Sequence, residues 1–325
     1  MFSDKLPEPR LRVSVGQHSE KGRKPLNQDF YGWRLPEEPQ LSSKGIAVAL
    51  ADGIGSSEVS QVAAEFAVMG FLDDYYCTSE TWSVRKSVDR VVAATNSWLH
   101  SRTHQSPYRY DKDRGYVCTF SGVVFKSTTA HVFHVGDSRV YRLQGSSLEQ
   151  LTRDHRTWVS GGESYLSRAV GFNPQVEIDY HSLEIERGDV FLLATDGVHE
   201  HVDGPFVAGA IRQAQGDLDG AARAIVEEAY RRGSADNLTV QIVVVEDLPE
   251  HGLSELQQQL ARLQPAPLLE ARDEIDGYRV VREIHASARS HIYLAVDLES
   301  GAPVALKTPS TELHADAEHL ERFLM

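Results

Sequence analysis

The stretch Lys44–Gly55, KGIAVALADGIG, decides the fold. Residues 44–51 are predicted to form a strand buried on both faces, because the unbroken apolar run Ile46–Ala51 shows no polar alternation. Asp52 follows this run directly, so an acid stands where the buried strand leaves the core. Gly53 comes next and has no side chain, which leaves room for backbone or a ligand to come close to that acid.

Helices and further strands surround this stretch. A helix is predicted directly after it, with Ser56 or Ser57 as the N-cap, and a second helix from about Ser83 to His104. Short apolar runs predict other strands at residues 12–17, 116–125, 130–135, 139–143, 190–195 and 238–245, and helical patterns return at about 206–213 and 220–231. Strands combined with paired helices predict a layered α+β sandwich over residues 1–247.

Carboxylates stand beside the predicted strands at five places. Asp196 repeats the arrangement of Asp52, since it ends the apolar run VFLLAT, and the others are Asp29, Asp137 and Asp236. Strands that share one sheet system would bring several of these carboxylates to one edge, where their repulsion has to be offset by cations. All-oxygen ligands select hard ions such as Mg²⁺ and Mn²⁺. Solvated turn acids are the alternative, because Asp is usually exposed.

Composition narrows the function classes. Lys and Arg number 33 and Asp and Glu 47, so the formal net charge of the 325-residue chain is −14, which disfavours nucleic-acid binding. Cys77 and Cys118 are too few for a disulfide framework or zinc site, and we expect two buried thiols in a reducing, cytoplasmic protein. No signal peptide or membrane span is evident, so no membrane contact is expected. His199 and His201 lack ligand spacing and are expected to be solvated or packed.

Seven motifs occur in one order between residues 11 and 247. They are KPLNQDF (24–30), ADGIG (51–55), FHVGDSRVYRL (133–143), LTRDH (151–155), LSRAVG (166–171), LATDGV (193–198) and ADNLTV (235–240). In order and spacing they resemble the metal-dependent Ser/Thr protein phosphatases of type 2C. The resemblance implies a four-layer α-β-β-α sandwich, two β-sheets flanked by paired helices, and hydrolysis of phosphorylated Ser and Thr in proteins.

The resemblance also implies roles for the acids. Asp52 would bridge two metal ions, Mn²⁺ or Mg²⁺, and the Gly53 carbonyl would bind one of them. Asp196 and Asp236 would ligate the other ion, and Asp29 would hold metal-bound waters. Two such ions, about 3.5 to 4 Å apart, lower the pKa of a shared water and clamp the phosphoryl oxygens during in-line attack. No phosphorylated enzyme intermediate is then expected.

Two parts of the chain depart from the family's pattern. The family commonly has Arg where this chain has Lys24, which acts on phosphate as a point charge. We expect Lys24 or the adjacent Arg23 to bind the phosphate, unless both are surface bases. Asp137 would serve a third, weaker metal site. The flap segment after His155 is short, with Glu163 as its only acid, which puts that third site and substrate gating in question.

A different region begins after residue 247. Residues 248–272 are polar and Gln-rich, which predicts a linker with a short helix at 254–263. Residues 278–307 then resemble the first three strands of a protein-kinase N-lobe and end in VALK, with Lys307 at the position that pairs ATP phosphates. An unrelated β-meander is the alternative.

The kinase resemblance is incomplete. Glycines of the phosphate loop are absent and neither a catalytic loop nor an Asp-Phe-Gly motif follows, so residues 273–325 are predicted to be a truncated, inactive, β-rich N-lobe with weak ATP binding at most. A helix is expected up to Met325, with Glu318 or Glu321 as the partner of Lys307. Exposed apolar strands in this segment predict packing on the phosphatase domain, self-association or poor order.

Three functions compete. An active phosphatase is favoured, because mutually repelling acids have no use in an inactive copy. A non-catalytic phosphoprotein-binding regulator with a degenerate phosphatase fold is the alternative, and a nucleotide-binding kinase fragment is the third. The chain resembles bacterial bifunctional phosphatase–kinase proteins, so phosphorylated Ser/Thr proteins and its own kinase domain are the expected partners.

Overall fold

The computed structural model describes residues 10–158, 164–249, 267–287 and 290–309. The chain divides into two compact units, Met1–Leu248 and Pro249–Met325. Within the described residues, every helix is too short or too polar to cross a membrane. The Glu163 position, the helix expected at 254–263 and the helix expected up to Met325 lie outside the described residues.

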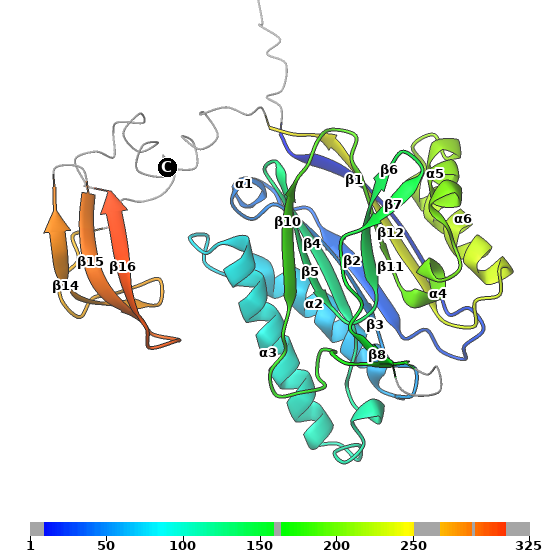
Figure 1. Cartoon of the computed structure of the whole chain (residues 1–325), viewed down its shortest axis with the longest axis horizontal. Helices are drawn as coiled ribbons and strands as arrows, with labels where there is room; N and C mark the ends of the chain where they lie inside the picture. The colour runs from blue at the N-terminus through cyan, green and yellow to red at the C-terminus, as the bar shows by residue number, and fades with distance from the viewer. Residues whose placement is uncertain (1–9, 159–163, 250–266, 288–289, 310–325) are drawn as a thin grey trace, which may run out of the picture. The chain divides into compact units, whose positions relative to one another are not determined.

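Two five-stranded antiparallel sheets build the first unit (Figure 1). One sheet has the order β1 (Arg12–Glu20), β12 (Leu238–Asp247), β11 (Val190–Ala194), β6 (Arg139–Gln144) and β7 (Ser147–Gln150). The other has the order β10 (Asp179–Glu184), β5 (Thr129–Val135), β4 (Phe120–Lys126), β3 (Ile46–Asp52) and β2 (Asp29–Arg34).

Strand β3 explains why the two sheets pack together. Its larger residues, Ile46, Val48 and Leu50, enter the core between the sheets, where the rings of Phe125 and Phe191 meet edge to face at 5.2 Å. Its alternate residues are alanines, which lie against the helices on the opposite face. Full burial of each larger side chain contributes about 1.5–3 kcal/mol. The apolar run predicted from the sequence is therefore a strand buried on both faces, as expected.

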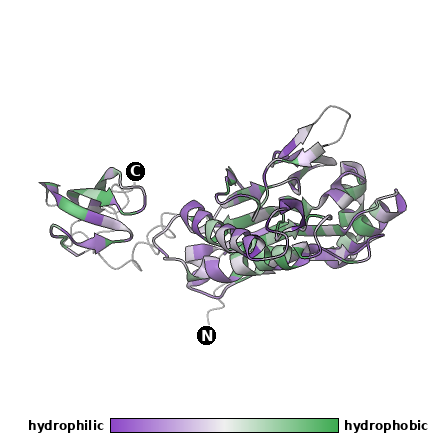
Figure 2. Ribbon diagram, turned by 90° about the horizontal axis from the view of Figure 1, so that it is seen from below, coloured by the Kyte–Doolittle hydropathy of each residue, from purple (hydrophilic) through white to green (hydrophobic). Residues whose placement is uncertain are grey.

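Helices cover the outer face of each sheet. α2 (Ser60–Cys77) and α3 (Val84–His104) pack on the sheet that contains β3. α4 (Asp196–His199), α5 (Gly204–Gln213) and α6 (Leu218–Arg231) form an apolar cluster with β11 and β12 of the other sheet. The short α1 (Gln40–Lys44) precedes β3. Hydrophobic residues concentrate inside this unit and hydrophilic ones on its helix exteriors (Figure 2).

Three local expectations are wrong. α2 begins at Ser60 with Val59 as its N-cap, so neither predicted serine caps it. The Ser57 hydroxyl donates to the carbonyls of Arg114 and Gly115 and accepts from the Val59 N–H. β4 begins only at Phe120, since the residues before it form isolated bridges, among them Gly53 with Cys118. Cys118 is buried, but Cys77, at the last position of α2, is exposed.

The second unit contains an antiparallel four-stranded sheet. Its order is β13 (Glu274–Ile275), β14 (Tyr278–Ala286), β15 (Ser290–Asp297) and β16 (Pro303–Pro309). The three strands predicted after residue 277 are therefore present. Val280, Tyr293 and Ala295 are its fully buried apolar side chains among the described residues.

Candidate active site

Five predicted acids meet at one edge of the two packed sheets. Asp52 ends β3 and lies opposite Asp29, the first residue of β2. Asp196 opens α4 directly after β11, Asp236 precedes β12, and Asp137 lies in the turn between β5 and β6. Burial raises the pKa of Asp52 well above its usual value, and the charges of the four other acids raise it further. The structure therefore brings together the carboxylates that the sequence placed at separate strand ends.

Burial also raises the pKa of three of the other acids, Asp29, Asp137 and Asp196. It raises the pKa of Asp29 to about 6, although hydroxyl groups of Thr239 and Thr195 donate to its Oδ2 at 2.6 and 3.1 Å. The pKa of Asp196 rises to about 7 through burial, with Asp137 and Asp236 adding to the effect. So many acids cannot all ionise in one half-buried group without positive charge nearby.

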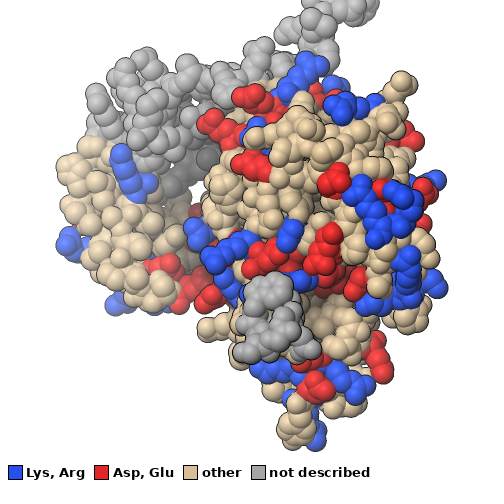
Figure 3. All heavy atoms as spheres, turned by 45° about the vertical axis from the view of Figure 1, so that its right-hand side comes forward, with Lys and Arg blue, Asp and Glu red and all other residues tan. Residues whose placement is uncertain are grey.

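Two basic side chains supply part of that charge. Arg156 contacts three acids: its Nε lies 2.6 Å from Asp137 Oδ2, and its terminal nitrogens lie 2.9 Å from Asp196 Oδ2 and 3.1 Å from Glu200 Oε1. Lys24 Nζ lies 2.9 Å from Asp236 Oδ1. On the face seen in Figure 3, acidic and basic side chains are interleaved.

Sequence reasoning missed Arg156 and Glu200. Arg156 directly follows the LTRDH motif, and Glu200 lies four residues after Asp196, one helical turn along α4. That spacing was a usable signal for Glu200. The approach of Arg156 depends on the pairing of β8 (Arg156–Trp158) with β9 (Ser164–Leu166), which no local pattern indicated.

The predicted phosphate binders separate. Arg23 donates to the backbone carbonyls of Ser234 and Tyr230, and its guanidinium stacks 4.1 Å from the centre of the Tyr230 ring. Only Lys24 of the pair reaches the acids. Asn237 fixes the segment that carries both residues, because its amide donates to the carbonyls of Lys21 and Leu26 at 3.0 and 2.9 Å.

The donor set fits hard divalent ions. Every acid in the group offers oxygen, and Asp29 Oδ1 is buried without a hydrogen-bond partner. Gly53, the residue after Asp52, lies close to other backbone: a Cβ there would be 2.8 Å from the Gln28 carbonyl oxygen, so a side chain would displace its neighbours. Over the described part of the chain, however, no three acidic, His or Cys side chains form a closed metal-binding group. Arg156 and Lys24 hold three of the carboxylates instead.

Two histidines fix the turn that carries Asp137. The carbonyl of Gly136 accepts from His134 Nε2 at 2.9 Å and from the backbone N–H of His155 at 2.7 Å. Gly136 N–H donates to His155 Nδ1 at 3.1 Å, and His155 Nε2 donates to Asp179 Oδ2 at 3.0 Å. Burial lowers the pKa of His134 to about 4, so its ring stays neutral. The sequence motif had identified His155 without indicating this role.

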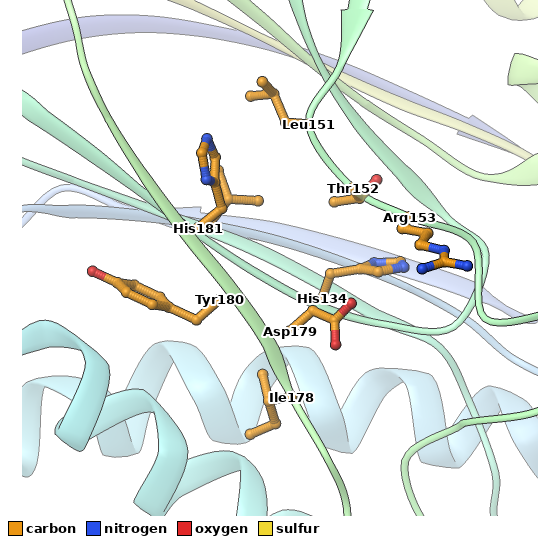
Figure 4. A pocket seen from close by; sticks show the side chains of 9 residues that line it. His134, Leu151, Thr152, Arg153, Ile178, Asp179, Tyr180 and His181 are labelled. Carbon is orange, nitrogen blue, oxygen red and sulfur yellow. The ribbon is translucent and has the colours of Figure 1, made fainter.

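A cavity of about 400 Å³ lies beside His134. His134, Asp179, Arg153 and Tyr180 are among the residues that line it (Figure 4). None of the five acids contributes to its wall. His199 is packed rather than solvated, with Nε2 donating to the Asp137 carbonyl at 3.0 Å, and burial lowers its pKa to about 4. We therefore place the candidate chemistry at the acids and not in this cavity.

Comparison with known proteins agrees with the fold and the motifs. The family description "Protein phosphatase 2C" matches residues 16–231. The serine/threonine protein phosphatase PstP of Mycobacterium tuberculosis is 28% identical over 245 residues, which cover 70% of this chain and 45% of that protein. The serine/threonine phosphatase stp of Listeria monocytogenes is 28% identical over 228 residues, which cover 63% of this chain and 86% of that protein. This chain thus spans about half the length of the mycobacterial relative.

Solved structures show the same fold. The S. agalactiae serine/threonine phosphatase has a TM-score of 0.63 at 22% identity and covers 72% of this chain and all of its own. The catalytic domain of PstP, solved in complex with two manganese ions, has a TM-score of 0.59 at 25% identity and covers 73% of this chain and all of its own. With the family match over residues 16–231, these similarities show that the chain belongs to the protein phosphatase 2C family of metal-dependent protein phosphatases.

Proposed function

We propose that this chain hydrolyses phosphoserine and phosphothreonine in proteins, with two Mn²⁺ or Mg²⁺ ions held by the acid group. The observation that carries the proposal is the meeting of five carboxylates at one sheet edge, one of them with a buried oxygen that has no partner. Membership of the phosphatase 2C family and the named activity of the relatives support the reaction type.

We assign the ions to named side chains. Asp52 would bridge both, the Gly53 carbonyl would bind one, and Asp196 and Asp236 would bind the other. When bound, the two ions supply an attacking water of lowered pKa and positive charge for the phosphoryl oxygens. The positive charge of the ions would offset the repulsion between the carboxylates, which is the physical reason that the proposed site needs metal.

The remaining groups orient reactants. Thr195 and Thr239 donate to one oxygen of Asp29, and its other oxygen, which is buried without a partner, would accept from metal-bound water. Lys24, a half-buried point charge, would bind a phosphate oxygen once Asp236 turns to metal. Arg23 has no such role in this proposal, because the backbone carbonyls of the α6 end already occupy its guanidinium.

A second proposal concerns the domain organisation of the whole chain. We assign residues 1–247 to a four-layer phosphatase domain, 248–272 to a linker and 273–325 to a partial kinase N-lobe. The packing of helices on both outer sheet faces supports the first assignment. The antiparallel β14–β15–β16 order, with Ile292 opposite Lys307, is compatible with the third. We expect no kinase activity from this segment.

Hydrolysis of a phosphothreonine peptide and of p-nitrophenyl phosphate by the full chain tests the function. After treatment with a chelator, turnover should be absent and should return on addition of Mn²⁺ or Mg²⁺. A folded chain that binds the phosphopeptide but never hydrolyses it with either ion would instead identify the non-catalytic regulator.

A further inference from the structure

We propose that the guanidinium of Arg156 serves as a built-in third cation of the acid group, so that this chain binds two divalent ions and Asp137 ligates none. The inference rests on the proposed function and goes beyond it, because it fixes the metal stoichiometry and gives Asp137 a partner other than metal.

Arg156 lies at the position where a third metal ion would otherwise offset the charge of Asp137. One planar group reaches Asp137, Asp196 and Glu200 at 2.6–3.1 Å, the spacing of charge-assisted hydrogen bonds. Asp137 is the most enclosed of the three, with its side chain 7% exposed, and its Oδ2 faces the guanidinium. A buried carboxylate has to be paired, and this one already is.

Arg156 is the cationic side chain that contacts Asp137, whereas the nearby Asp154 adds negative charge. His199 meets its backbone carbonyl, and burial keeps that ring neutral. His134 and His155 hydrogen-bond to the preceding Gly136, and their other ring nitrogens face Ser121 and Asp179. The pairing of Asp137 is therefore left to Arg156.

Arg156 is also held in position by its backbone. The preceding residue, His155, is fixed to Gly136 by backbone and side-chain hydrogen bonds, and Arg156 pairs with Leu166 in the β8–β9 ribbon. A tethered cation of this kind is present at high effective concentration, whereas a free ion has to be captured from solution. The guanidinium also keeps its charge at any pH at which the protein is folded.

The same contact has a consequence for the paired ions. Asp196 shares one oxygen, Oδ2, with Arg156, which leaves Oδ1 for a metal ion. Arg156 can thus set the position of a proposed metal ligand without touching the substrate. We classify it as a positioning residue.

Calorimetric titration of the chelator-treated full chain with Mn²⁺ tests the inference, with free Mn²⁺ followed in parallel by electron paramagnetic resonance. The wild-type chain should bind two ions. Arg156→Gln should bind a third, at least about tenfold more tightly than any third ion on the wild type, because a positive charge a few ångströms from the carboxylates is gone. Arg156→Lys keeps the charge and should stay at two.

Two further variants make the result specific. Arg142→Gln removes an arginine of matched exposure that pairs with Asp189, away from the acid group, and should bind two ions like the wild type. Asp137→Asn, with Arg156 intact, should also bind two, whereas the double variant Asp137→Asn/Arg156→Gln should lose the third ion again. Circular dichroism confirms that each variant is folded.

The outcomes separate this inference from the proposed function. Three outcomes would overturn the role of Arg156 but leave the proposed function standing. They are two ions with unchanged affinities in every variant, a third ion on the wild type, and loss of an ion in Asp137→Asn. A folded wild-type chain that binds no Mn²⁺ would overturn the proposed function and this inference with it.

Discussion

The acid edge and the C-terminal sheet are both built from antiparallel strands, yet they differ in what covers them. Six of the seven residues of β3 are buried, whereas only Val280 is buried among the nine of β14. Asp52 follows a strand covered on both faces and has a strongly raised pKa. Asp276, also followed by glycine, lies in an exposed turn before β14. The same dipeptide is thus enclosed among other acids at the end of β3 and exposed in the turn before β14.

The largest effect is expected from removing one proposed metal ligand. Asp236→Asn should lower kcat by about 10³-fold, because it removes a charged ligand of one ion and several kcal/mol of transition-state stabilisation depend on the metals. Steady-state hydrolysis of the phosphothreonine peptide at saturating Mn²⁺ measures this. If Asp236→Asn keeps wild-type turnover, the ligand assignment is wrong.

A substitution in the core of the first unit should lower stability more than a substitution in the C-terminal sheet. Leu50 is fully buried between the sheets, so Leu50→Ala should lower the free energy of unfolding by about 2–5 kcal/mol. Val281 on β14 is 44% exposed, and Val281→Ala should change it by at most about 0.5 kcal/mol. Urea unfolding followed by circular dichroism gives both numbers. Equal effects would mean that the C-terminal sheet is packed as tightly as the first unit.

The pH dependence of stability should reveal the buried acids. Burial raises the pKa of Asp29 from 3.8 to about 6 and that of Asp196 to about 7, so both stay protonated in the folded, metal-free chain when the unfolded chain has ionised. Their contribution to stability is full below about pH 4 and is lost as pH rises to about 7.

Urea unfolding with chelator present, at several pH values, measures that loss. In Asp29→Asn the loss of unfolding free energy with rising pH should be smaller by an amount on the order of 1–3 kcal/mol. Mn²⁺ should reverse the loss, because the ions favour the ionised carboxylates. A slope that is the same in the wild type and in Asp29→Asn would contradict the raised pKa.

A smaller effect is expected at the base beside the acids. Lys24→Ala should raise KM several-fold and change kcat less, because a point-charge contact is made in the ground state and the transition state alike. Arg23→Ala is the matched control and should leave KM unchanged, since its side chain contacts the end of α6. If Arg23→Ala raises KM and Lys24→Ala does not, Arg23 is the residue that binds the phosphate.

The smallest effect should come from removing the second unit. Every proposed metal ligand precedes residue 247, so a chain ended at Leu248 should keep its Mn²⁺-dependent turnover and differ in oligomeric state or solubility. Size-exclusion chromatography and hydrolysis assays compare the two chains. Loss of turnover in a folded, Mn²⁺-binding short chain would show that the second unit completes the site.

The central strands, the edge strand β1 and all five acids could be predicted from the sequence, and the other three edge strands of the two large sheets could not. β3, β4, β5, β11 and β12 carry dense apolar runs, whereas the missed strands β2, β7 and β10 all lie at sheet edges and mix polar with apolar residues. The acids were visible because each adjoins a strand end. The hydroxyls on Asp29 and the guanidinium on Asp137 were not, because both depend on how distant segments pack.

Mn²⁺ binding and hydrolysis by Asp52→Asn, compared with Asp276→Asn, test the central claim most directly. Both variants change an Asp-Gly pair, but only Asp52 lies among the acids. Asp276→Asn should bind two Mn²⁺ ions and turn over phosphopeptide like the wild type, whereas a folded Asp52→Asn should lose at least one ion and nearly all turnover. Wild-type ion binding and turnover in Asp52→Asn would contradict a metal-dependent site at this edge.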